Sequence, residues 1–284
     1  MGIKTQLEQL LNKQIHSIDK LHESVDTIIY RLTCSRRTFL AKLLPLDKKS
    51  RLIAETNGLK HIQKQGVISI PNILAEGPLK EYYCLCTEFI LSKKGDKNEM
   101  KRFASQLAAL HSIEGDHFGL PSSNYIGPLD QINSPSDHWA TFYFENRLQS
   151  QLQFAIQKNM LYPGELPKET DIQRYCEELL SDVQRPMLIH GDLWSGNFLI
   201  STNGEAYLID PAIYYGDPLV DIAMSQLFGG FGQHFYEQYF SIHKPKKKDA
   251  EKIDLYQLYF LLVHLNLFGI SYKESVLRII HSWK

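Results

Sequence analysis

The sequence changes character once, at a polar, turn-rich stretch that reads LSKKGDKNE over residues 91–99. Before it, short apolar runs follow the pattern of β-strands, and after it apolar residues recur at the three- and four-residue spacing of helices. A chain of 284 residues is long enough for two such parts, each with its own core. We therefore expect an α+β fold of two lobes, residues 1–90 and residues 91–284, with a hinge at about 87–96.

The N-terminal lobe is predicted to be a small antiparallel sheet with a helix. An amphipathic helix over about residues 3–18 precedes two β-like runs, residues 27–33 and 37–44, which Cys34–Arg36 would join as a hairpin. Residues 50–66 space their leucines and isoleucines as a helix does, and Gly66 suits the position just after its end. Two further strand patterns follow before the linker. The order strand, strand, helix, strand, strand favours an antiparallel sheet.

The C-terminal lobe is predicted to be mainly helical. Asp96 is expected to cap a helix together with Glu99, three residues further on. Further helical patterns cover roughly residues 137–159, 169–182, 219–227, 233–242, 249–268 and 272–283.

Composition and charge narrow the classes of partner. The net charge is −1, so neither nucleic acid nor an anionic membrane is expected as a partner. The most apolar stretch, residues 258–268, is too short to span a bilayer and contains His264 and Asn266. The four cysteines lack metal-site spacing and suit reduced thiols. These features predict a cytoplasmic protein. We expect a monomer or weak dimer, although the sequence leaves the oligomeric state open.

The segment HGDLWSGN, residues 190–197, places three chemically active side chains between the apolar runs PMLI and FLI. His, Asp, Asn and two glycines disfavour helix and strand, which indicates a loop held between two buried strands. Asp192 and Asn197 could simply satisfy the backbone groups of a turn, as Asp and Asn often do. The residues that follow favour a catalytic loop instead.

Asn203-Gly204 lies between two apolar runs and predicts a two-residue type I′ hairpin turn. Counting outward from this turn places Asn197 opposite Asp210, roughly 5 Å away on the same side of the sheet. Two hard oxygen ligands side by side suit Mg²⁺, with phosphate oxygens completing the coordination. Asp192 would then lie near the metal as a carboxylate that accepts a proton from an alcohol, as phosphoryl transfer requires.

The other parts of a phosphotransferase are expected in the N-terminal lobe. Phosphate binding needs a cation on a strand, held by a carboxylate. Lys42 lies in the strand pattern FLAKLL and Glu55 on the following helix, which predicts an ion pair, although Lys42 could instead be a solvated edge residue. Adenine needs backbone donors and acceptors where the lobes join, and residues 87–90 lie at that junction.

Two long segments, LIHGDLWSGNFLI and YLIDPAIYYGDPLVDIAMSQLFGGF, resemble the fructosamine kinase (ketosamine-3-kinase) family. This family is aminoglycoside-phosphotransferase-like and has a protein-kinase-like fold. The tryptophan after HGDL and the DPAxYYG pattern are more specific than HGD alone, and the stretch from NYIG to Arg147-Leu148 is similar too. The resemblance covers roughly residues 25–280. It implies an ATP- and Mg²⁺-dependent kinase that phosphorylates a sugar hydroxyl of small-molecule ketosamines or glycated lysines, a deglycation activity.

The resemblance also implies a role for each matching residue. Asp192 matches the catalytic base, and Asn197 and Asp210 match the Mg²⁺ ligands. The remaining matches are Lys42, Glu55, Ser24, Glu88, Phe89 and Ile90 for ATP, Trp194 and Tyr215 for substrate, and His190 and Asp221 for structural support of the loop.

The chain departs from the family at the phosphate loop. The usual Gly-Gly-Ser-like segment is replaced by LHESVDTIIY, residues 21–30, in which Glu23 and Asp26 would lie near phosphate charge and Ser24 retains one contact. Two alternatives therefore stay open: a kinase of another small alcohol, such as an aminoglycoside, choline or a sugar, and a nucleotide-binding pseudokinase. A protein kinase is disfavoured, because no Ala-Pro-Glu motif follows the metal-binding aspartate.

Overall fold

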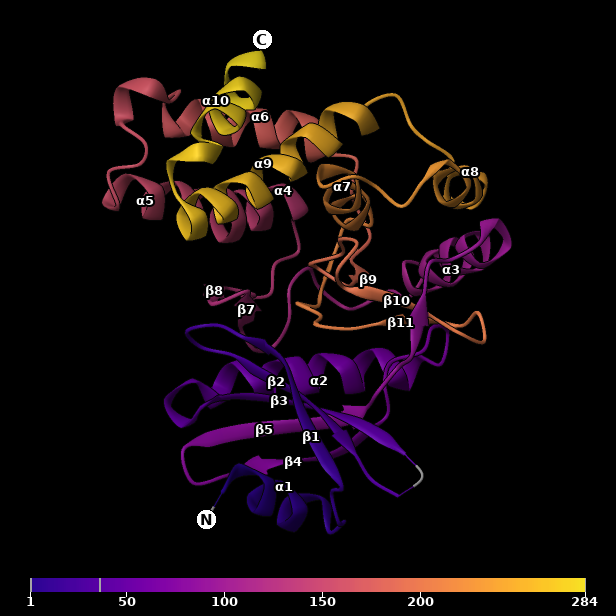
Figure 1. Ribbon diagram of the computed structural model, residues 1–284. Helices are drawn as coiled ribbons and strands as arrows, with labels where there is room; N and C mark the ends of the chain where they lie inside the picture. Colours follow the sequence, from indigo (N-terminus) through magenta and orange to yellow (C-terminus); the bar gives the residue numbers. More distant parts are fainter. Residues whose placement is uncertain (1, 36, 284) are drawn as a thin grey trace. The chain divides into compact units, whose positions relative to one another are not determined.

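The chain folds into two compact units (Figure 1). The structure is a computed structural model and describes residues 2–35 and 37–283, so Arg36 of the expected Cys34–Arg36 turn lies outside the described residues. The first unit extends to Gly95 and also contains Leu199–Asp210. The second unit contains Asp96–Phe198 and resumes at Pro211.

The first unit is built on a five-stranded antiparallel sheet in the order β1-β2-β3-β5-β4. Its strands are β1 (Ser17–Glu23), β2 (Ile28–Thr33), β3 (Thr38–Pro45), β4 (Ile73–Pro78) and β5 (Tyr82–Glu88). Helix α1 (Ile3–Leu11) packs against β4, and α2 (Lys49–Gln65) packs against β3 and β5 (Figure 1). A 3₁₀ turn, Leu46–Lys48, leads from β3 into α2.

The N-terminal helix is shorter than the sequence pattern suggests. The expectation of a helix to about residue 18 is wrong, because Asn12 takes a left-handed φ of 49° and ends α1 at Leu11. The chain then turns into strand β1, which pairs with β2. At the end of α2, by contrast, Gly66 has a φ of 69°, so the predicted glycine stop is confirmed.

Residues 199–210, which the sequence analysis places in the C-terminal lobe, belong to the first unit in the structure. Strand β10 (Phe198–Ser201) pairs with β6 (Ser92–Lys93), so that Ile200 lies opposite Lys93. Strand β11 (Ala206–Leu208) completes this three-stranded sheet in the order β11-β10-β6.

The second unit is mainly helical, as predicted, and the whole chain is therefore an α+β protein. Its helices are α3 (Lys97–Leu110), α4 (Trp139–Tyr143), α5 (Ser150–Gln157), α6 (Glu169–Leu180), α7 (Leu219–Leu227), α8 (Gln233–Ile242), α9 (Asp249–Phe268) and α10 (Lys273–Ser282). A π-helical segment, Phe144–Gln149, joins α4 to α5, and 3₁₀ turns occur at Pro163–Glu165 and Ile270–Tyr272. The two short sheets pair β7 (Asn124–Ile126) with β8 (Leu129–Gln131) and β9 (Met187–Ile189) with β12 (Tyr214–Gly216).

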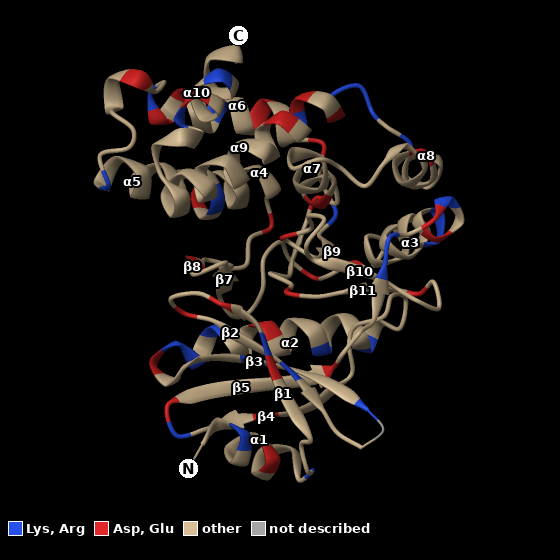
Figure 2. Cartoon of the chain, in the orientation of Figure 1, with Lys and Arg blue, Asp and Glu red and all other residues tan. Residues whose placement is uncertain are grey.

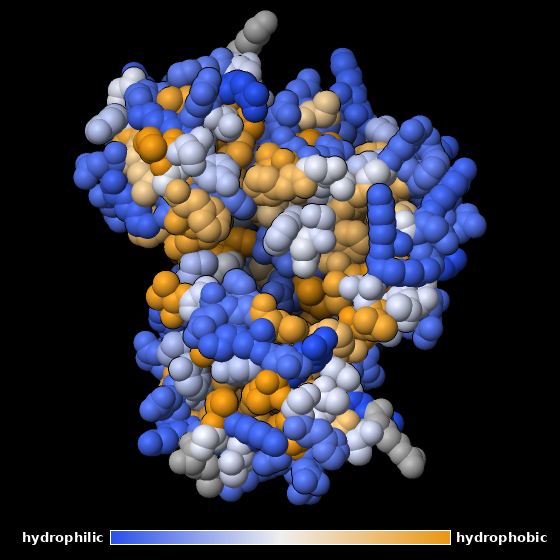
Figure 3. All heavy atoms as spheres, in the orientation of Figure 1, coloured by the Kyte–Doolittle hydropathy of each residue, from blue (hydrophilic) through white to orange (hydrophobic). Residues whose placement is uncertain are grey.

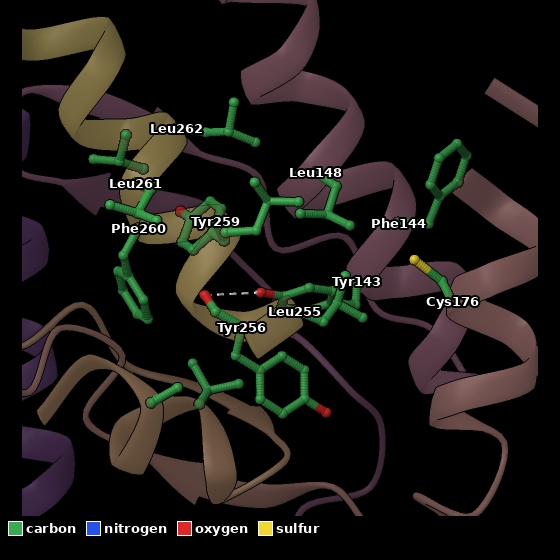
Figure 4. Close-up of a cluster of buried hydrophobic side chains, with 14 of the residues drawn as sticks. Tyr143, Phe144, Leu148, Cys176, Leu255, Tyr256, Tyr259, Phe260, Leu261 and Leu262 are labelled. Carbon is green, nitrogen blue, oxygen red and sulfur yellow. Dashed lines mark hydrogen bonds between the residues drawn. The ribbon is translucent and has the colours of Figure 1, made fainter. Parts of the chain in front are cut away.

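Helix α9 lies at the centre of the second unit's core and is apolar on most of its circumference. Its residues pack against α4, the π-helical segment that follows it, and α6 (Figure 4). The Tyr143 hydroxyl of α4 donates a hydrogen bond to the backbone carbonyl of Tyr256 at 3.4 Å. The Tyr256 hydroxyl in turn donates to Asp217 at 2.7 Å, which satisfies a buried carboxylate. The most apolar stretch of the sequence is thus a core helix.

The surface is mixed in charge and polarity. Acidic and basic residues are interspersed along the elements of each unit (Figure 2), and hydrophilic residues alternate with apolar ones on the face drawn in Figure 3. The four cysteines are free and buried.

Within the part of the chain that the structure describes, no helix combines the length and the apolar character needed to cross a membrane.

The predicted cap of α3 is confirmed. The Asp96 carboxylate accepts hydrogen bonds from the backbone N–H groups of Asn98 and Glu99 at 2.8 and 2.9 Å. The Glu99 carboxylate accepts one from the backbone N–H of Asp96 at 2.8 Å, which completes a reciprocal capping box.

Replacing this cap should measurably destabilise the protein. Asp96→Ala leaves the first backbone donors of α3 without their side-chain acceptor, so we expect the free energy of unfolding to fall by about 0.5–2 kcal/mol in urea titrations. Lys97→Ala changes the next, exposed residue and should alter it by less than about 0.5 kcal/mol. Equal effects from the two variants would contradict the capping role.

Candidate active site

The hairpin after the HGDLWSGN loop has a longer turn than predicted. The Ser201 N–H donates to the Glu205 carbonyl at 2.8 Å, and the Gly204 N–H donates to the Ser201 carbonyl at 2.8 Å. The loop therefore has three residues, with Gly204 alone taking a positive φ of 82°, whereas a type I′ turn needs positive φ at two residues. The two-residue prediction is wrong.

The longer turn shifts the register by one residue. Ser201 faces Glu205, so outward counting brings Asn197 opposite residue 209 and not opposite Asp210. Asp210 itself leaves the strand conformation, with a φ of 51°. The register argument for a shared metal site is lost, and the metal assignment rests on the motif and on the chemistry of each side chain.

Asp221 of α7 holds the start of the HGDLWSGN loop through hydrogen bonds to its backbone. The two carboxylate oxygens of this fully buried residue accept the backbone N–H groups of His190 and Gly191, at 2.7 and 2.8 Å. The His190 carbonyl accepts a hydrogen bond from the backbone N–H of Ala212 at 2.9 Å. The backbone of the loop is therefore fixed on both sides at its start.

The two glycines of the loop have different reasons to be glycine. Gly191 has a φ of 83°, and a Cβ there would lie 2.1 Å from the carbonyl oxygen of Ala212. At Gly196, a Cβ would lie 2.4 Å from the ring of Trp194, so the indole packs directly over this glycine. Trp194 is held in this way while 39% of it stays exposed to solvent.

Asp192 and Asn197 are joined across the loop. The Asn197 amide nitrogen donates to the backbone carbonyl of Asp192 at 2.8 Å and to its carboxylate at 3.1 Å. Both amide hydrogens of Asn197 are thereby used, and its carbonyl oxygen is left as the atom that could coordinate a cation. Asn197 thus orients the carboxylate of Asp192.

In the first unit, Lys42 bridges two carboxylates. Its Nζ lies 2.7 Å from Glu55 Oε2, so the predicted ion pair is present, and 3.0 Å from Asp210 Oδ2. The side chains of Lys42 and Glu55 are each 15% exposed, while that of Asp210 is 46% exposed. One cation therefore faces two carboxylates in a largely buried cluster.

The imbalance of charge is visible in the pKa values. Burial raises the pKa of Glu55 to about 8, the Asp210 carboxylate adds to this rise, and Lys42 opposes it. Burial alone would lower the pKa of Lys42, but Asp210 and Glu55 outweigh it and raise that pKa. Lys42 is thus firmly charged, while Glu55 is mostly protonated below about pH 8, so that at pH 7 the positive charge of Lys42 faces the negative charge of Asp210.

In residues 21–30, the segment that departs from the family's phosphate-loop pattern, the acidic side chains are paired with basic ones. Asp26, between β1 and β2, forms ion pairs with Lys48 and Arg51, the latter at 3.2 Å. The hydrogen bond from Lys48 is the main cause that lowers the pKa of Asp26. Glu23 pairs with Lys20 at 2.6 Å, and Ser24 closes the turn by accepting the Thr27 N–H at 3.2 Å.

At the end of β5, where the chain enters the linker, some backbone N–H groups already have hydrogen-bond partners. The N–H groups of Glu88 and Phe89 donate to the carbonyls of Asn72 and Thr38, at 2.9 and 3.2 Å. The Glu88 side chain accepts from the Asn72 amide at 2.7 Å. Among the hydrogen bonds of the described residues, none uses the N–H of Ile90.

A cavity of about 480 Å³ in the second unit has Asp192 and Trp194 in its wall. Tyr215, the other residue expected to contact substrate, is not among the described residues that line it. Its ring lies against Gly115, where a Cβ would be 2.6 Å from the ring, and its strand β12 pairs with β9.

Two buried residues that the sequence reading missed support the site. His111 Nε2 donates to Asp221 at 3.0 Å, and His111 Nδ1 shares a 2.7 Å hydrogen bond with the Tyr239 hydroxyl. Arg147 is fully buried, with its guanidinium 4.0 Å from the ring centroid of Tyr214. The only sequence signal for Arg147 is its place in the family-like stretch, and His111 has none.

A second polar network holds the segment that follows Asp210. The Asn124 side chain donates to the Ile213 carbonyl at 2.8 Å, and the Gln131 side chain donates to the Ala212 carbonyl at 3.1 Å. These contacts tie residues 124–131 to the segment that follows Asp210.

The fold is that of the protein-kinase-like phosphotransferases. It combines an antiparallel sheet carrying a Lys–Glu pair with a mainly helical unit carrying the Asp-x₄-Asn loop. The solved structure of a thermostable aminoglycoside phosphotransferase mutant has this fold, with a TM-score of 0.66 over 99% of both chains at 15% identity.

The family follows from closer similarities. The fructosamine kinase family model matches residues 1–284. A probable ketoamine kinase of Enterococcus faecium is 36% identical over 89% of this chain and 90% of its own, and one of Synechocystis is 36% identical over 87% and 83%. A solved structure named as a candidate fructosamine-3-kinase, from Haemophilus somnus, is 27% identical with a TM-score of 0.88, covering 99% of this chain and 96% of its own. The chain belongs to the fructosamine kinase family and is an enzyme, a kinase.

The raised pKa of Glu55 should appear in the pH dependence of stability. The pKa rises from 4.5 in the unfolded chain to about 8 in the folded one, so the stabilisation is complete below about pH 4.5 and is lost as pH rises through about 8. The unfolding free energy of wild type minus that of Glu55→Gln should therefore fall over this window in urea titrations. Glu81→Gln, at an exposed turn, is the control. A difference that stays flat would contradict the shift.

The contact between Gly191 and Ala212 makes alanine intolerable in the loop. Gly191→Ala forces a displacement, and because a shift of about 1 Å at reacting groups can cost about 10²-fold, we expect kcat to fall by at least that factor. Gly66→Ala is the matched control, since it has a similar φ of 69° but nothing within 4 Å of the added Cβ. It should lose stability and keep its kcat. Wild-type kcat in Gly191→Ala would show that the loop tolerates movement.

Proposed function

We propose that this protein is an ATP-dependent ketosamine kinase, which transfers the γ-phosphoryl group to a sugar hydroxyl of glycated amines or lysines. The proposal deepens the family assignment by naming donor and acceptor. The observation that carries it is the Asp192 carboxylate, oriented by Asn197 at the wall of a 480 Å³ cavity. A cavity of this size suits a small sugar derivative.

Asp192 is proposed as the base. Its carboxylate would accept the proton of the sugar hydroxyl as the oxygen attacks the γ-phosphorus and the bond to the departing ADP breaks, and would orient that hydroxyl beforehand. The Asn197 amide limits the directions that the carboxylate can take, and Asp221 keeps the loop backbone in register. Trp194 would provide a flat apolar surface on which the sugar ring stacks.

Lys42 is proposed to bind the ATP phosphates, with Glu55 holding it extended. The Glu88 carbonyl and the Ile90 N–H are the backbone groups proposed to pair with adenine, since the N–H groups of Glu88 and Phe89 are already used. Ser24 is proposed to retain one contact in the phosphate loop. The ion pairs of Asp26 support this proposal, because they compensate a charge that would otherwise repel phosphate.

Asn197 and Asp210 are proposed to hold Mg²⁺ together with phosphate oxygens of the nucleotide. The donor set fits, because the Asn197 carbonyl oxygen and the Asp210 carboxylate, whose side chain is 46% exposed, are hard oxygen ligands. Bound there, Mg²⁺ would neutralise charge on the phosphates.

An acceptor panel tests the proposal directly. ATP consumption would be measured with fructosamine and ribulosamine adducts, an aminoglycoside, choline and free sugars, and the product's regiochemistry assigned by NMR. We expect turnover with one or more ketosamines only. Turnover with choline or the aminoglycoside alone would overturn the acceptor class, and ATP binding without any turnover would support a pseudokinase.

Two substitutions separate the proposed base from the proposed metal ligand. Asp192→Asn removes the proton acceptor but not a metal ligand, so kcat should fall by roughly 10²–10⁴-fold with ATP affinity little changed. Asp210→Asn removes a charged ligand of a hard cation, so it should weaken binding of Mg²⁺-ATP as well as turnover. Titration calorimetry and steady-state kinetics measure both effects. Near wild-type turnover in Asp192→Asn would contradict the role given to the loop.

A further inference from the structure

The cavity that contains Asp192 has a second wall, far from it in sequence, which the reaction itself does not use. This wall is formed by Phe228, at the end of α7, by His264 and Phe268 of α9, and by Tyr272. We call these four residues the aromatic wall. All of them belong to the same unit as Asp192 and Trp194.

The aromatic wall is a continuous cluster. The ring of His264 lies 4.6 Å from that of Phe228, 5.4 Å from that of Phe268 and 5.3 Å from that of Tyr272, measured between centroids. Aromatic pairs at these distances hold one another in place and present a preformed apolar surface.

The cavity is poor in charge. Asp192 is the one Asp, Glu, Lys or Arg among the described residues that line it. The His264 Nδ1–H donates to the Phe260 carbonyl at 2.8 Å, and burial lowers the pKa of His264, so the ring is neutral at pH 7. The wall can therefore cover an apolar group, but it offers a carboxylate no cation.

Two aromatic residues of the cavity are unusually exposed for their type. Phe268 is 65% exposed and Trp194 is 39% exposed, although large apolar side chains gain free energy from being covered. Trp194 stands next to the base and Phe268 belongs to the aromatic wall, so a ligand that covers both must extend from the sugar site into the wall.

We propose that the aromatic wall binds the amine substituent of the ketosamine, and that it selects apolar and aromatic substituents over those that carry a carboxylate. This inference rests on the proposed function, because it takes the sugar hydroxyl to lie at Asp192. In a ketosamine the sugar and the amine are a few bonds apart, so a sugar at Asp192 and Trp194 directs the substituent into the same cavity. The cavity would thus discriminate between amine substituents as well as bind the sugar.

The test uses three ketosamines of the one sugar that the acceptor panel identifies, formed from methylamine, benzylamine and 4-(aminomethyl)benzoate. The last two differ only by a carboxylate. We expect kcat/KM to be about 10-fold higher for the benzylamine adduct than for the methylamine adduct, because a ring is covered. The benzoate adduct should fall about 10-fold below the benzylamine adduct, since Asp192 repels it and no cation offsets the loss of its hydration.

Phe268→Ala locates this selectivity. It should bring the benzylamine-to-methylamine ratio of kcat/KM from about 10 to near 1. Because Phe268 is 65% exposed, the variant should fold, and its Tm is measured alongside. Ile242→Ala, an exposed apolar residue of α8 outside the cavity, is the matched control and should keep the wild-type ratio.

The outcomes separate the inference from the proposed function. Phosphorylation of all three adducts with similar kcat/KM, or a ratio that survives in Phe268→Ala, would overturn the inference and leave a ketosamine kinase. If the acceptor panel finds no ketosamine that is phosphorylated, the proposed function is overturned and the inference with it; if the panel's ketosamine is phosphorylated but none of the three adducts is, the inference alone is overturned. A preference for the benzoate adduct would show that a cation reaches the cavity, which also overturns the inference.

Discussion

One buried carboxylate, that of Asp221, holds in place the loop that carries Asp192, the proposed base. A carboxylate taken out of water is costly unless hydrogen bonds replace its hydration. Asp221 obtains them from two successive backbone N–H groups, of His190 and Gly191, and from the ring of His111. Because the carboxylate gains its partners only when the loop is in place, the folding of α7 and the position of the loop are coupled.

The residues that follow in the loop fix the positions of Asp192 and Trp194 relative to the backbone that Asp221 holds. Gly191 has a positive φ, which few residues other than glycine adopt, and the chain turns there just before Asp192. Asn197 then ties its amide to the carboxylate of Asp192, and Gly196 leaves room for the indole of Trp194. Asp192 and Trp194 are therefore each held in place by a neighbouring residue of the same loop, as preorganised sites require.

Local features of the fold could be predicted because their causes are local. The capping box of Asp96 and Glu99 and the glycine stop at Gly66 depend only on adjacent residues. The pairing of Lys42 with Glu55 could be predicted because a cation between apolar neighbours needs a partner, and the next helix offers a carboxylate. The α+β class followed from the change of apolar spacing at residues 91–99, and the family assignment and kinase-like fold followed from long motifs.

The sequence-based predictions failed where the structure depends on features that the spacing of apolar and polar residues does not show. Strand β1 is exposed along most of its length, so it lacks the alternation that marks a half-buried strand. At Asn203-Gly204, a bulge at the glycine competes with the two-residue turn, and the choice moves every pair by one residue. The role of His111 depends on α7 and α8 meeting it in space, 110 and 128 residues away along the chain.

The ion pairs of Asp26 with Lys48 and Arg51 restrain the β1–β2 hairpin, and their strength depends on salt concentration. A glycine-rich loop gains its mobility from the backbone, whereas here the tip is restrained by two ion pairs whose side chains are 18–37% exposed. Ion pairs with this exposure are partly screened, because the Debye length is about 8 Å at physiological ionic strength and shortens as salt is added. The hairpin should therefore be rigid in dilute buffer and loosen in concentrated salt. With the proposed contact between Ser24 and ATP, the rate at which nucleotide enters and leaves would follow ionic strength more closely than the chemical step does.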